Sequence, residues 1–157
     1  MRRTDREVTD KNQILEIIDG CDALSLALMD GEYPYVIEMN FGYEESEGGL
    51  RIYLHGAKDG KKLDLMRAND HCAFSMSRKH DLVPGRVECA TTFKYESVCG
   101  RGRISILEGD EAVHGLTVMS KKYLPDMPNA FSAKHAAAVT VMRIDVESYT
   151  GKRREVK

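Results

Sequence analysis

The chain has 157 residues, of which 42% are hydrophobic and 31% are charged, and its formal net charge at pH 7 is -2. This length predicts a single domain over residues 1–157, with mobile ends at 1–8 and 153–157 and a core that needs no disulfide bonds. The near balance of charges disfavours broad electrostatic binding to nucleic acid or to an anionic membrane surface.

The sequence predicts no signal peptide, membrane span or metal site. No apolar run follows the basic start MRRTDREVTDKNQ, and no stretch approaches the roughly 20 apolar residues of a membrane helix. The cysteines form no C-x-x-C pair, and no histidine or cysteine spacing suits a metal ion. We therefore expect a cytoplasmic protein with free thiols.

The first predicted element is a helix over residues 10–19. Ile14, Ile17 and Ile18 follow the i, i+3, i+4 spacing of one helix face, and Asp10 suits its N-cap.

Alternating apolar and polar residues next predict three strands, at 24–28, 35–41 and 50–56. The intervening DGEY and EESEGG segments have the composition of turns. Because short turns join antiparallel neighbours, we expect the three strands to form a meander.

The next predicted elements are a short helix at 59–68, a strand at 71–77 and a polar loop at 78–88. They are followed by a long β-rich run at 89–107, a helix at 110–124 and a final strand at 135–152. The β-rich run is either two strands or one strand bent at its glycines. In the final strand the apolar residues change phase between Val141 and Met142, which indicates a bulge or burial on both faces. Hairpin-linked strands do not suit a parallel sheet, so we expect a mostly β, α+β fold: a small antiparallel barrel with peripheral helices.

Residues 54–66, LHGAKDGKKLDLM, lead from a predicted strand into a predicted helix. Backbone N–H groups at a helix start have no intrahelical partner, and the helix dipole adds positive charge there. Gly56 and Gly60 allow close approach of a ligand, while Lys61 and Lys62 add cations where the dipole disfavours them. A bound phosphate would remove that penalty. The alternative is a solvent-facing lysine pair after a flexible turn.

Four segments in chain order carry a family resemblance: YPYVIEMNFGY, LRIYLHGAKDGKKLDLMRAND, YESVCGRGRISIL and RIDVESYTGK. They are similar to the nitroimidazole-resistance (Nim) branch of the pyridoxamine 5'-phosphate oxidase-like flavoproteins, and the resemblance runs from about Thr9 to Lys152. It implies an antiparallel split β-barrel that forms a homodimer, with two FMN sites at the dimer interface.

The resemblance also implies which residues bind the flavin. Around the phosphate it implies His55, Lys61 and Lys62, and beside the isoalloxazine ring it implies the strand residues Val36, Ile37, Glu38, Met39 and Asn40. A second flavin-contacting strand would contribute Ser97 and Val98. A flavin needs its phosphate neutralised, an apolar wall and a few backbone donors and acceptors at its ring edge. The carboxylate of Glu38 must therefore point to solvent or to a basic partner.

His71 is the candidate catalytic residue, because an imidazole can donate a proton near neutral pH and a histidine in this region is associated with the Nim active site. The alternative for His71 is a partly exposed residue at a strand end. The implied function is an FMN-dependent oxidoreductase that reduces a small molecule, with a nitroaromatic such as a nitroimidazole as candidate substrate. The competing function is a non-catalytic flavin or haem binder for storage or sensing, with FAD or haem in place of FMN and His71 or His55 as haem ligand.

Overall fold

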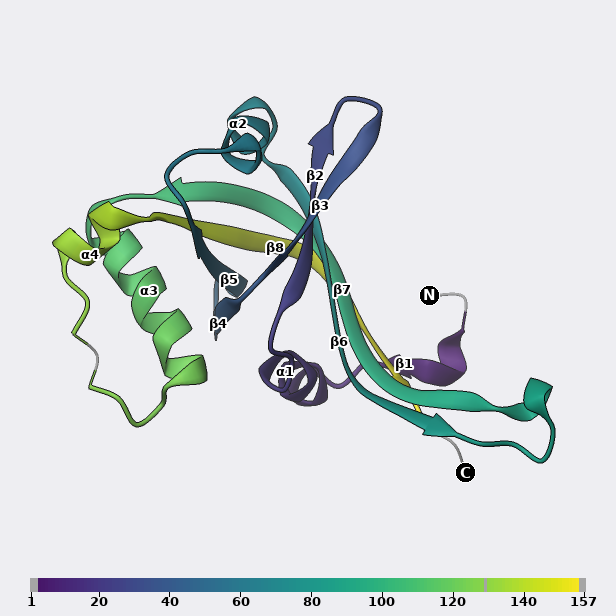
Figure 1. The fold of residues 1–157 in the computed structure, drawn as a ribbon. Coiled ribbons are helices and arrows are strands. Elements are labelled where there is room, and N and C mark those ends of the chain that lie inside the picture. The colour runs from purple at the N-terminus through teal and green to yellow at the C-terminus, as the bar shows by residue number, and fades with distance from the viewer. Residues whose placement is uncertain (1–2, 129, 156–157) are drawn as a thin grey trace.

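The computed structural model of the chain describes residues 3–128 and 130–155 (Figure 1). Its α-helices are Lys11–Asp19 (α1), Lys61–Ala68 (α2), Gly109–Tyr123 (α3) and Ala133–Ala138 (α4). Its strands are Glu7–Val8 (β1), Leu24–Asp30 (β2), Tyr33–Met39 (β3), Phe41–Ser46 (β4), Gly49–Gly56 (β5), His71–Val83 (β6), Thr92–Leu107 (β7) and Thr140–Arg154 (β8). Two short 3-10 helices lie at Thr4–Arg6 and Glu88–Ala90. None of these described helices is long and apolar enough to cross a membrane.

The described strands form one antiparallel sheet in the order β3-β2-β6-β7-β8-β5-β4, and β1 pairs with β8. Although β3 and β4 stand at the two ends of this order, they are consecutive in the chain and only Asn40 separates them. The sheet therefore curls round on itself, with the long strands β6, β7 and β8 at its centre (Figure 1). This confirms the predicted mostly β, antiparallel barrel-like fold with peripheral helices.

The predicted three-strand meander is wrong. Residues 35–41, which were expected to form one strand, change from β3 to β4 at Asn40. The strands instead form two hairpins, β2–β3 and β4–β5, at opposite ends of the strand order. Their positions are decided by long-range partners, because β2 pairs with β6 and β5 pairs with β8.

The helix predictions near residues 10–19, 59–68 and 110–124 are confirmed to within two residues at each end. For α1 the local signal is sufficient, since the Asp10 side chain accepts a hydrogen bond from the Gln13 N–H at 2.9 Å. The final strand starts at Thr140 instead of residue 135, because Ser132 caps the short helix α4. That helix was not predicted.

The predicted loop at 78–88 is partly wrong, because β6 continues to Val83. After a bulge that follows Arg78, β6 pairs again with β7 through Leu82 opposite Phe93 and Val83 opposite Thr92. The polar composition of this segment hides the strand, since its hydrogen bonds are supplied by β7. Residues 92–107 form a single strand with a register shift between Arg101 and Gly102, as the bent alternative predicts.

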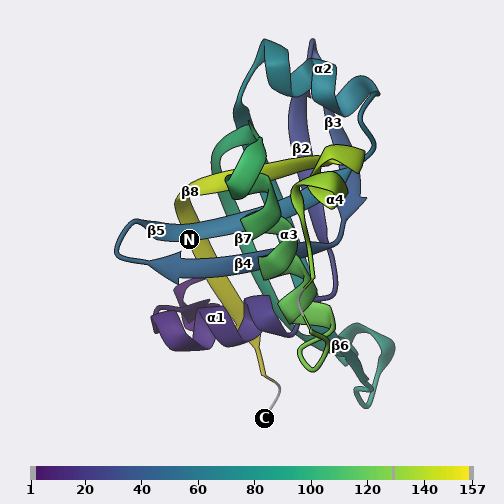
Figure 2. The same ribbon diagram turned by 90° about the vertical axis from the view of Figure 1, so that its left-hand side faces the viewer.

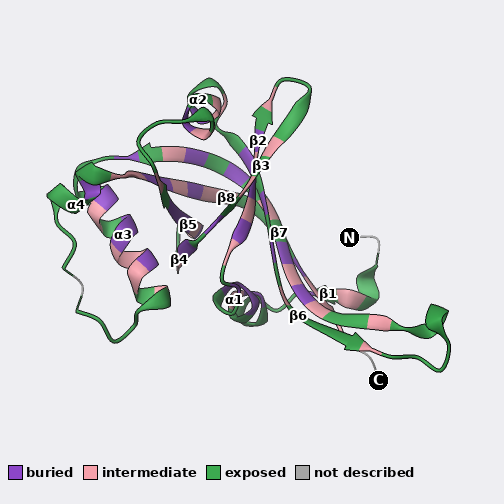
Figure 3. Ribbon diagram, in the orientation of Figure 1, coloured by how far each residue is buried: buried purple, intermediate pink, exposed green. Residues whose placement is uncertain are grey.

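Two apolar clusters form the core. The larger lies between the inner face of the sheet, α1 and α2, and the smaller lies under α3. Met142 belongs to the first cluster and Val141 to the second, so the predicted phase change reflects burial on both faces. Figure 3 shows the resulting bands of buried residues along β7 and β8. Gly42 lets α3 lie close to β4, because a Cβ there would come within 2.6 Å of the Met119 backbone.

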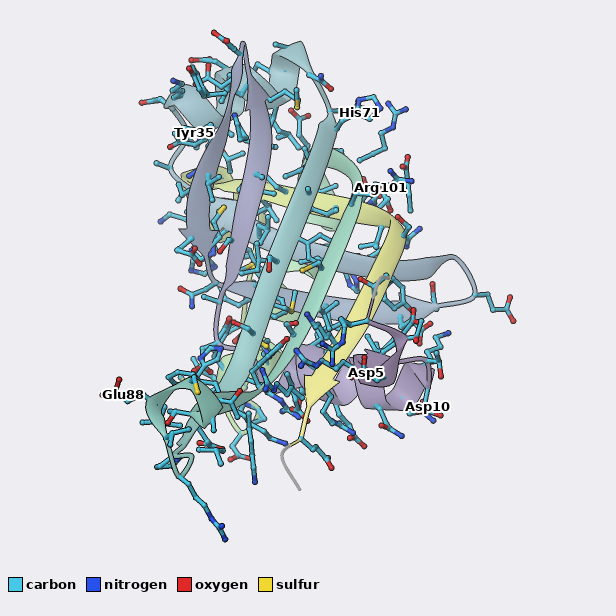
Figure 4. All side chains as sticks on the ribbon, turned by 90° about the vertical axis from the view of Figure 1, so that its right-hand side faces the viewer. Asp5, Asp10, Tyr35, His71, Glu88 and Arg101 are labelled. Carbon is cyan, nitrogen blue, oxygen red and sulfur yellow. The ribbon has the colours of Figure 1, made fainter. Side chains whose placement is uncertain are left out.

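The opposite face of β2, β6 and β7 has no helix over it (Figure 4). We call this the outer face. Its central side chains alternate with the buried ones, and most of them are small: Ser25, Ala27, Ala73, Ser75, Ser77, Ser97 and Cys99. Arg101, which pairs with Ala73, is the long charged side chain among them. Glu38, on β3, also lies on this face opposite Ser25.

The chain ends predicted to be mobile lie partly in regular structure. Val8 pairs with Gly151, and β8 continues through Arg153 to Arg154. Residues 1–2 and 156–157 lie outside the described part of the chain.

Candidate functional site

Strand β3, the segment predicted to run beside a flavin ring, pairs with β2 along one edge and with no described strand along the other. Its side chains alternate: Val36 is 57% exposed on the outer face, whereas Ile37 and Met39 pack against the core. Among the predicted positions 36–40, only Val36 therefore presents an apolar side chain to a ligand on the outer face. The free edge adds unpaired backbone donors and acceptors.

Glu38 points to the outer face and not to a basic partner. The Ser25 hydroxyl donates a hydrogen bond of 2.5 Å to its carboxylate, and no ion pair to Glu38 occurs among the described residues. Of the two orientations expected from the sequence, toward solvent or toward a basic partner, Glu38 therefore has the first.

The start of α2 brings the two predicted phosphate-binding lysines close to β3. Gly60, with φ of 121°, precedes the helix, and the Leu63 N–H donates to its carbonyl at 2.9 Å. The N–H groups of Lys61 and Lys62 in the first turn have no intrahelical acceptor. These two groups and the helix dipole give this end of α2 a positive potential.

The two lysine side chains have different surroundings. The Lys61 ammonium lies 2.5 Å from a carboxylate oxygen of Asp30 and 5.5 Å from the centre of the Tyr35 ring. Lys62 is partly buried, and its ammonium lies over Gly56, where a Cβ would collide with it. Among the described residues Lys62 has no carboxylate partner, so its charge is available to an anion.

His55 is separated from this lysine pair by the alternation of β5. Its neighbours Leu54 and Gly56 face the inside of the sheet, so His55 points to the other side, toward α3. There it lines a cavity of about 440 Å³ together with Asn40. The remaining lining residues come from α3, α4 and the segment between them: Leu116, Met119, Ser120, Tyr123, Leu124, Phe131, His135 and Val139. Figure 2 shows α3 and α4 on this side of the sheet.

Tyr123 fixes the β3–β4 junction at the mouth of this cavity. Its hydroxyl donates to the Asp22 carbonyl at 2.7 Å and accepts from the Phe41 N–H at 3.0 Å. The Asn40 amide donates to the same Asp22 carbonyl at 3.0 Å. Asn40 therefore has a structural role in addition to its position beside the cavity.

The cavity was missed by sequence reasoning. Two of its lining residues, Leu124 and Phe131, lie in a part of the sequence whose apolar residues follow no helical or strand period. His135 caps α4, because its Nδ1 accepts a hydrogen bond from the Ser132 N–H at 3.1 Å. Nε2 of the neutral ring therefore carries the proton.

His71 lies at the start of β6, on the outer face and 59% exposed at its side chain. Asn69 Oδ1 accepts the His71 backbone N–H at 3.0 Å and lies 2.8 Å from Nδ1. Because Oδ1 can only accept, Nδ1 carries a proton and Nε2 is free. His71 can therefore donate a proton from Nε2 only as an imidazolium.

The strand residues Ser97 and Val98 differ in access. Ser97 lies on the outer face opposite Ser77, but Val98 is fully buried in the core and can offer a ligand only its backbone. Figure 4 shows His71 and Arg101 at the same end of the sheet as Tyr35. The structure thus groups the predicted residues as Lys61 and Lys62 beside β3, Asn40 and His55 at the cavity, and His71 and Ser97 on the outer face.

The chain is similar to known proteins in sequence and in structure. The sequence model described as pyridoxamine 5'-phosphate oxidase matches residues 10–153. A candidate 5-nitroimidazole antibiotic resistance protein from Bacteroides thetaiotaomicron is 31% identical, with a TM-score of 0.80 and coverage of 94% of this chain and 86% of that chain. No curated protein sequence is significantly similar to the chain.

Two more distant structures share the fold. A flavocytochrome from Azotobacter vinelandii is 19% identical, with a TM-score of 0.82 and coverage of 99% of this chain and 72% of that chain. An FAD- and haem-binding protein from Mycobacterium smegmatis is 17% identical, with a TM-score of 0.83 and coverage of 96% of this chain and 74% of that chain.

Proposed function

Because the chain belongs to the pyridoxamine 5'-phosphate oxidase family, as its sequence resemblance predicted, we propose that it is an FMN-dependent oxidoreductase that reduces a small molecule. The observation that carries this proposal is the Lys62 ammonium at the start of α2, which lies over Gly56 and has no carboxylate partner among the described residues. The flavin supplies the redox chemistry, and the protein supplies binding, orientation and electrostatics.

The residues at this site suit a flavin phosphate. A phosphate at the start of α2 would meet Lys62 and the free N–H groups of the first turn. Lys61, held by Asp30, would contribute less charge. From there the five residues from Tyr35 to Met39 extend about 13 Å along β3, and their free backbone edge and Val36 would lie along the rest of the cofactor.

We propose a nitroaromatic as substrate class, supported by the 31% identity to the candidate 5-nitroimidazole resistance protein. His71, with Nε2 free, would donate a proton to the reduced substrate when its ring is charged. In this proposal His71 is the catalytic residue of the protein.

We also propose that the protein is a homodimer. The uncovered outer face supports this, because its small side chains, such as Ala27, Ala73 and Ser75, let a second sheet come close. At a strand spacing of about 4.8 Å and a rise of about 3.3 Å per residue, the four strands β3, β2, β6 and β7 of this face cover roughly 19 Å by 36 Å, or about 700 Å². That is close to the roughly 800 Å² that each partner buries in a stable interface.

A non-catalytic haem or flavin binder is the second candidate, because His55 and His135 line the same apolar cavity. An iron ligand needs an unprotonated nitrogen, however, and Nδ1 of His135 is occupied by Ser132 while Nε2 carries the proton. Of the two, only His55 is unconstrained by a side-chain hydrogen bond within the described chain. At this cavity a haem would therefore have His55 as its histidine ligand.

The absorption spectrum of the purified protein tests the proposal. We expect flavin bands in the blue and near ultraviolet, with FMN as the nucleotide released on denaturation. A single sharp Soret band would support the haem alternative. If the protein stays colourless after FMN is added, both are wrong. If the FMN-loaded protein does not reduce any nitroaromatic with a chemical or nicotinamide reductant, the flavin proposal stands and the oxidoreductase proposal fails.

A further inference from the structure

The β6–β7 hairpin extends beyond the body of the molecule as an arm of residues 79–94. In Figure 1 it projects away from the rest of the chain, and no helix packs on it. In this arm β6 and β7 pair only with each other. A two-stranded hairpin is marginally stable in water, so such an arm needs further contacts to keep one position.

The arm exposes large apolar side chains. Leu82 is 56% exposed and Phe93 is 50% exposed, and the two stand directly opposite each other. Opposed residues of an antiparallel pair lie on the same face, so they form one apolar patch. Phe93, Ser97 and Cys99 all lie at odd-numbered positions of β7, and the bulge in this region belongs to β6, so their side chains point to the same face of the strand. The patch therefore continues the outer face.

The other end of the outer face carries a second apolar patch. Met29 is 54% exposed and Val36 is 57% exposed, both on the β2–β3 hairpin. Met29 stands beside His71 of β6, and Leu82 lies 11 residues further along that strand. The two patches are therefore roughly 36 Å apart along the strand direction. The outer face thus has two apolar ends and a centre of small residues.

This distribution is self-complementary. A two-fold axis that lies in the plane of the face and crosses the strands would bring each end of one copy onto the opposite end of another. The charges agree with such a pairing: Glu32 lies at the tip of the β2–β3 hairpin, and Arg86 lies in the loop of the arm. Within residues 3–128 and 130–155, neither of the two takes part in an ion pair.

We propose that the arm clasps a second copy of this chain, with Leu82 and Phe93 of one protomer packed on Met29 and Val36 of the other. The proposal rests on the homodimer proposed above. Because Val36 belongs to β3, each arm would cover the flavin-binding strand of the opposite protomer. The flavin site of one copy would then be incomplete without the arm of the other.

The test compares two double substitutions on the arm. Leu82→Asp with Phe93→Asp places two carboxylates on the outer face, and Val83→Asp with Thr92→Asp places the same two on the neighbouring opposed pair, facing the other side. Sedimentation equilibrium measures the dimer dissociation constant of each. Two arms per dimer lose their apolar contacts, so we expect the first variant to raise this constant about a hundredfold or more, and the second less than about threefold.

A cross-link makes the contact itself visible. We expect Val36→Cys with Phe93→Cys, in a chain that also carries Cys89→Ser and Cys99→Ser, to give a covalent dimer with a short bifunctional thiol reagent. Thr92→Cys in place of Phe93→Cys is the control and should give none. A monomeric wild type overturns the homodimer and the arm together. A dimeric wild type that responds equally to both carboxylate pairs, or forms no 36–93 cross-link, overturns only the arm.

Discussion

Lys61 and Lys62 are neighbours in sequence, but Asp30 neutralises only the first. We therefore expect Lys62→Ala to weaken FMN binding about ten- to hundredfold, the loss of a charge-assisted hydrogen bond of about 1.5–3 kcal/mol. Lys61→Ala should cost less than about threefold. Flavin-fluorescence titrations with FMN, and with riboflavin as the control that lacks the phosphate, measure both effects. Equal FMN affinity of the wild type, Lys61→Ala and Lys62→Ala would mean that the two lysines are solvated surface residues with no part in phosphate binding.

Glu96 carries the main buried charge among the described residues, at 4% exposure. Burial alone would raise the pKa of this carboxyl, but hydrogen bonds from Arg78, Arg153 and Lys79 outweigh it and hold the pKa below its ordinary value of 4.5. A carboxyl with a lowered folded-state pKa stabilises the fold above its unfolded pKa and loses that contribution as the pH falls through the folded value.

We accordingly expect Glu96→Gln to lower the free energy of unfolding by about 3 kcal/mol at pH 7, because it leaves partly buried arginines unpaired. The difference from the wild type should shrink as the pH falls below about 4.5, where the unfolded wild-type carboxyl takes up a proton, and should be lost below the lowered pKa of the folded carboxyl. Urea unfolding from pH 7 to pH 3 measures this. Glu147→Gln, at an exposed pair with Arg103, should cost less than about 1 kcal/mol and serves as control. Equal losses in both variants would contradict the assignment.

At the scale of elements, α3 holds the junction of β3 and β4 through one hydroxyl. Tyr123→Phe removes a donor to Asp22 and an acceptor for Phe41 while it keeps the ring. We expect a loss of about 1–3 kcal/mol in the free energy of unfolding, since a buried polar partner is left unsatisfied. Tyr33→Phe, at a residue 72% exposed on the β2–β3 hairpin, should change it by less than about 0.5 kcal/mol. Thermal or urea unfolding of the two variants decides, and a neutral Tyr123→Phe would mean that packing alone fixes this junction.

At the scale of the whole molecule, a cofactor that binds only the folded state raises its stability by mass action. At a free FMN concentration of about 100 times the dissociation constant the gain is about 2.7 kcal/mol, or roughly 5–10 °C in Tm for a chain of this size. The Tm of the apoprotein should also rise with protein concentration if dimerisation stabilises the fold. Differential scanning calorimetry over a dilution series measures both. A Tm independent of protein concentration would argue against the dimer.

Local patterns determined much of this protein. The isoleucine spacing and the Asp10 cap predict α1 because both act within a few residues of the helix itself. The sequence also indicates that β8 is buried on both faces at Val141 and Met142, since neighbouring side chains of a strand point to opposite faces whatever the strand pairs with. The segment around Lys61 and Lys62 was also recognisable, because its glycines, its charges and its resemblance to a flavoprotein family are all contiguous in the chain.

Only the tertiary structure decided the rest, because each remaining feature depends on residues far apart in sequence. The strand over residues 35–41 is interrupted at Asn40, because the Asp22 carbonyl accepts hydrogen bonds from the Asn40 amide and from the Tyr123 hydroxyl. The arm is a strand at Asp81–Val83 only because β7 pairs with it. Lys61 differs from Lys62 because the β2–β3 turn brings Asp30 to one of them. The sheet order, the cavity under α3 and the uncovered outer face follow from such long-range pairings, which no local period encodes.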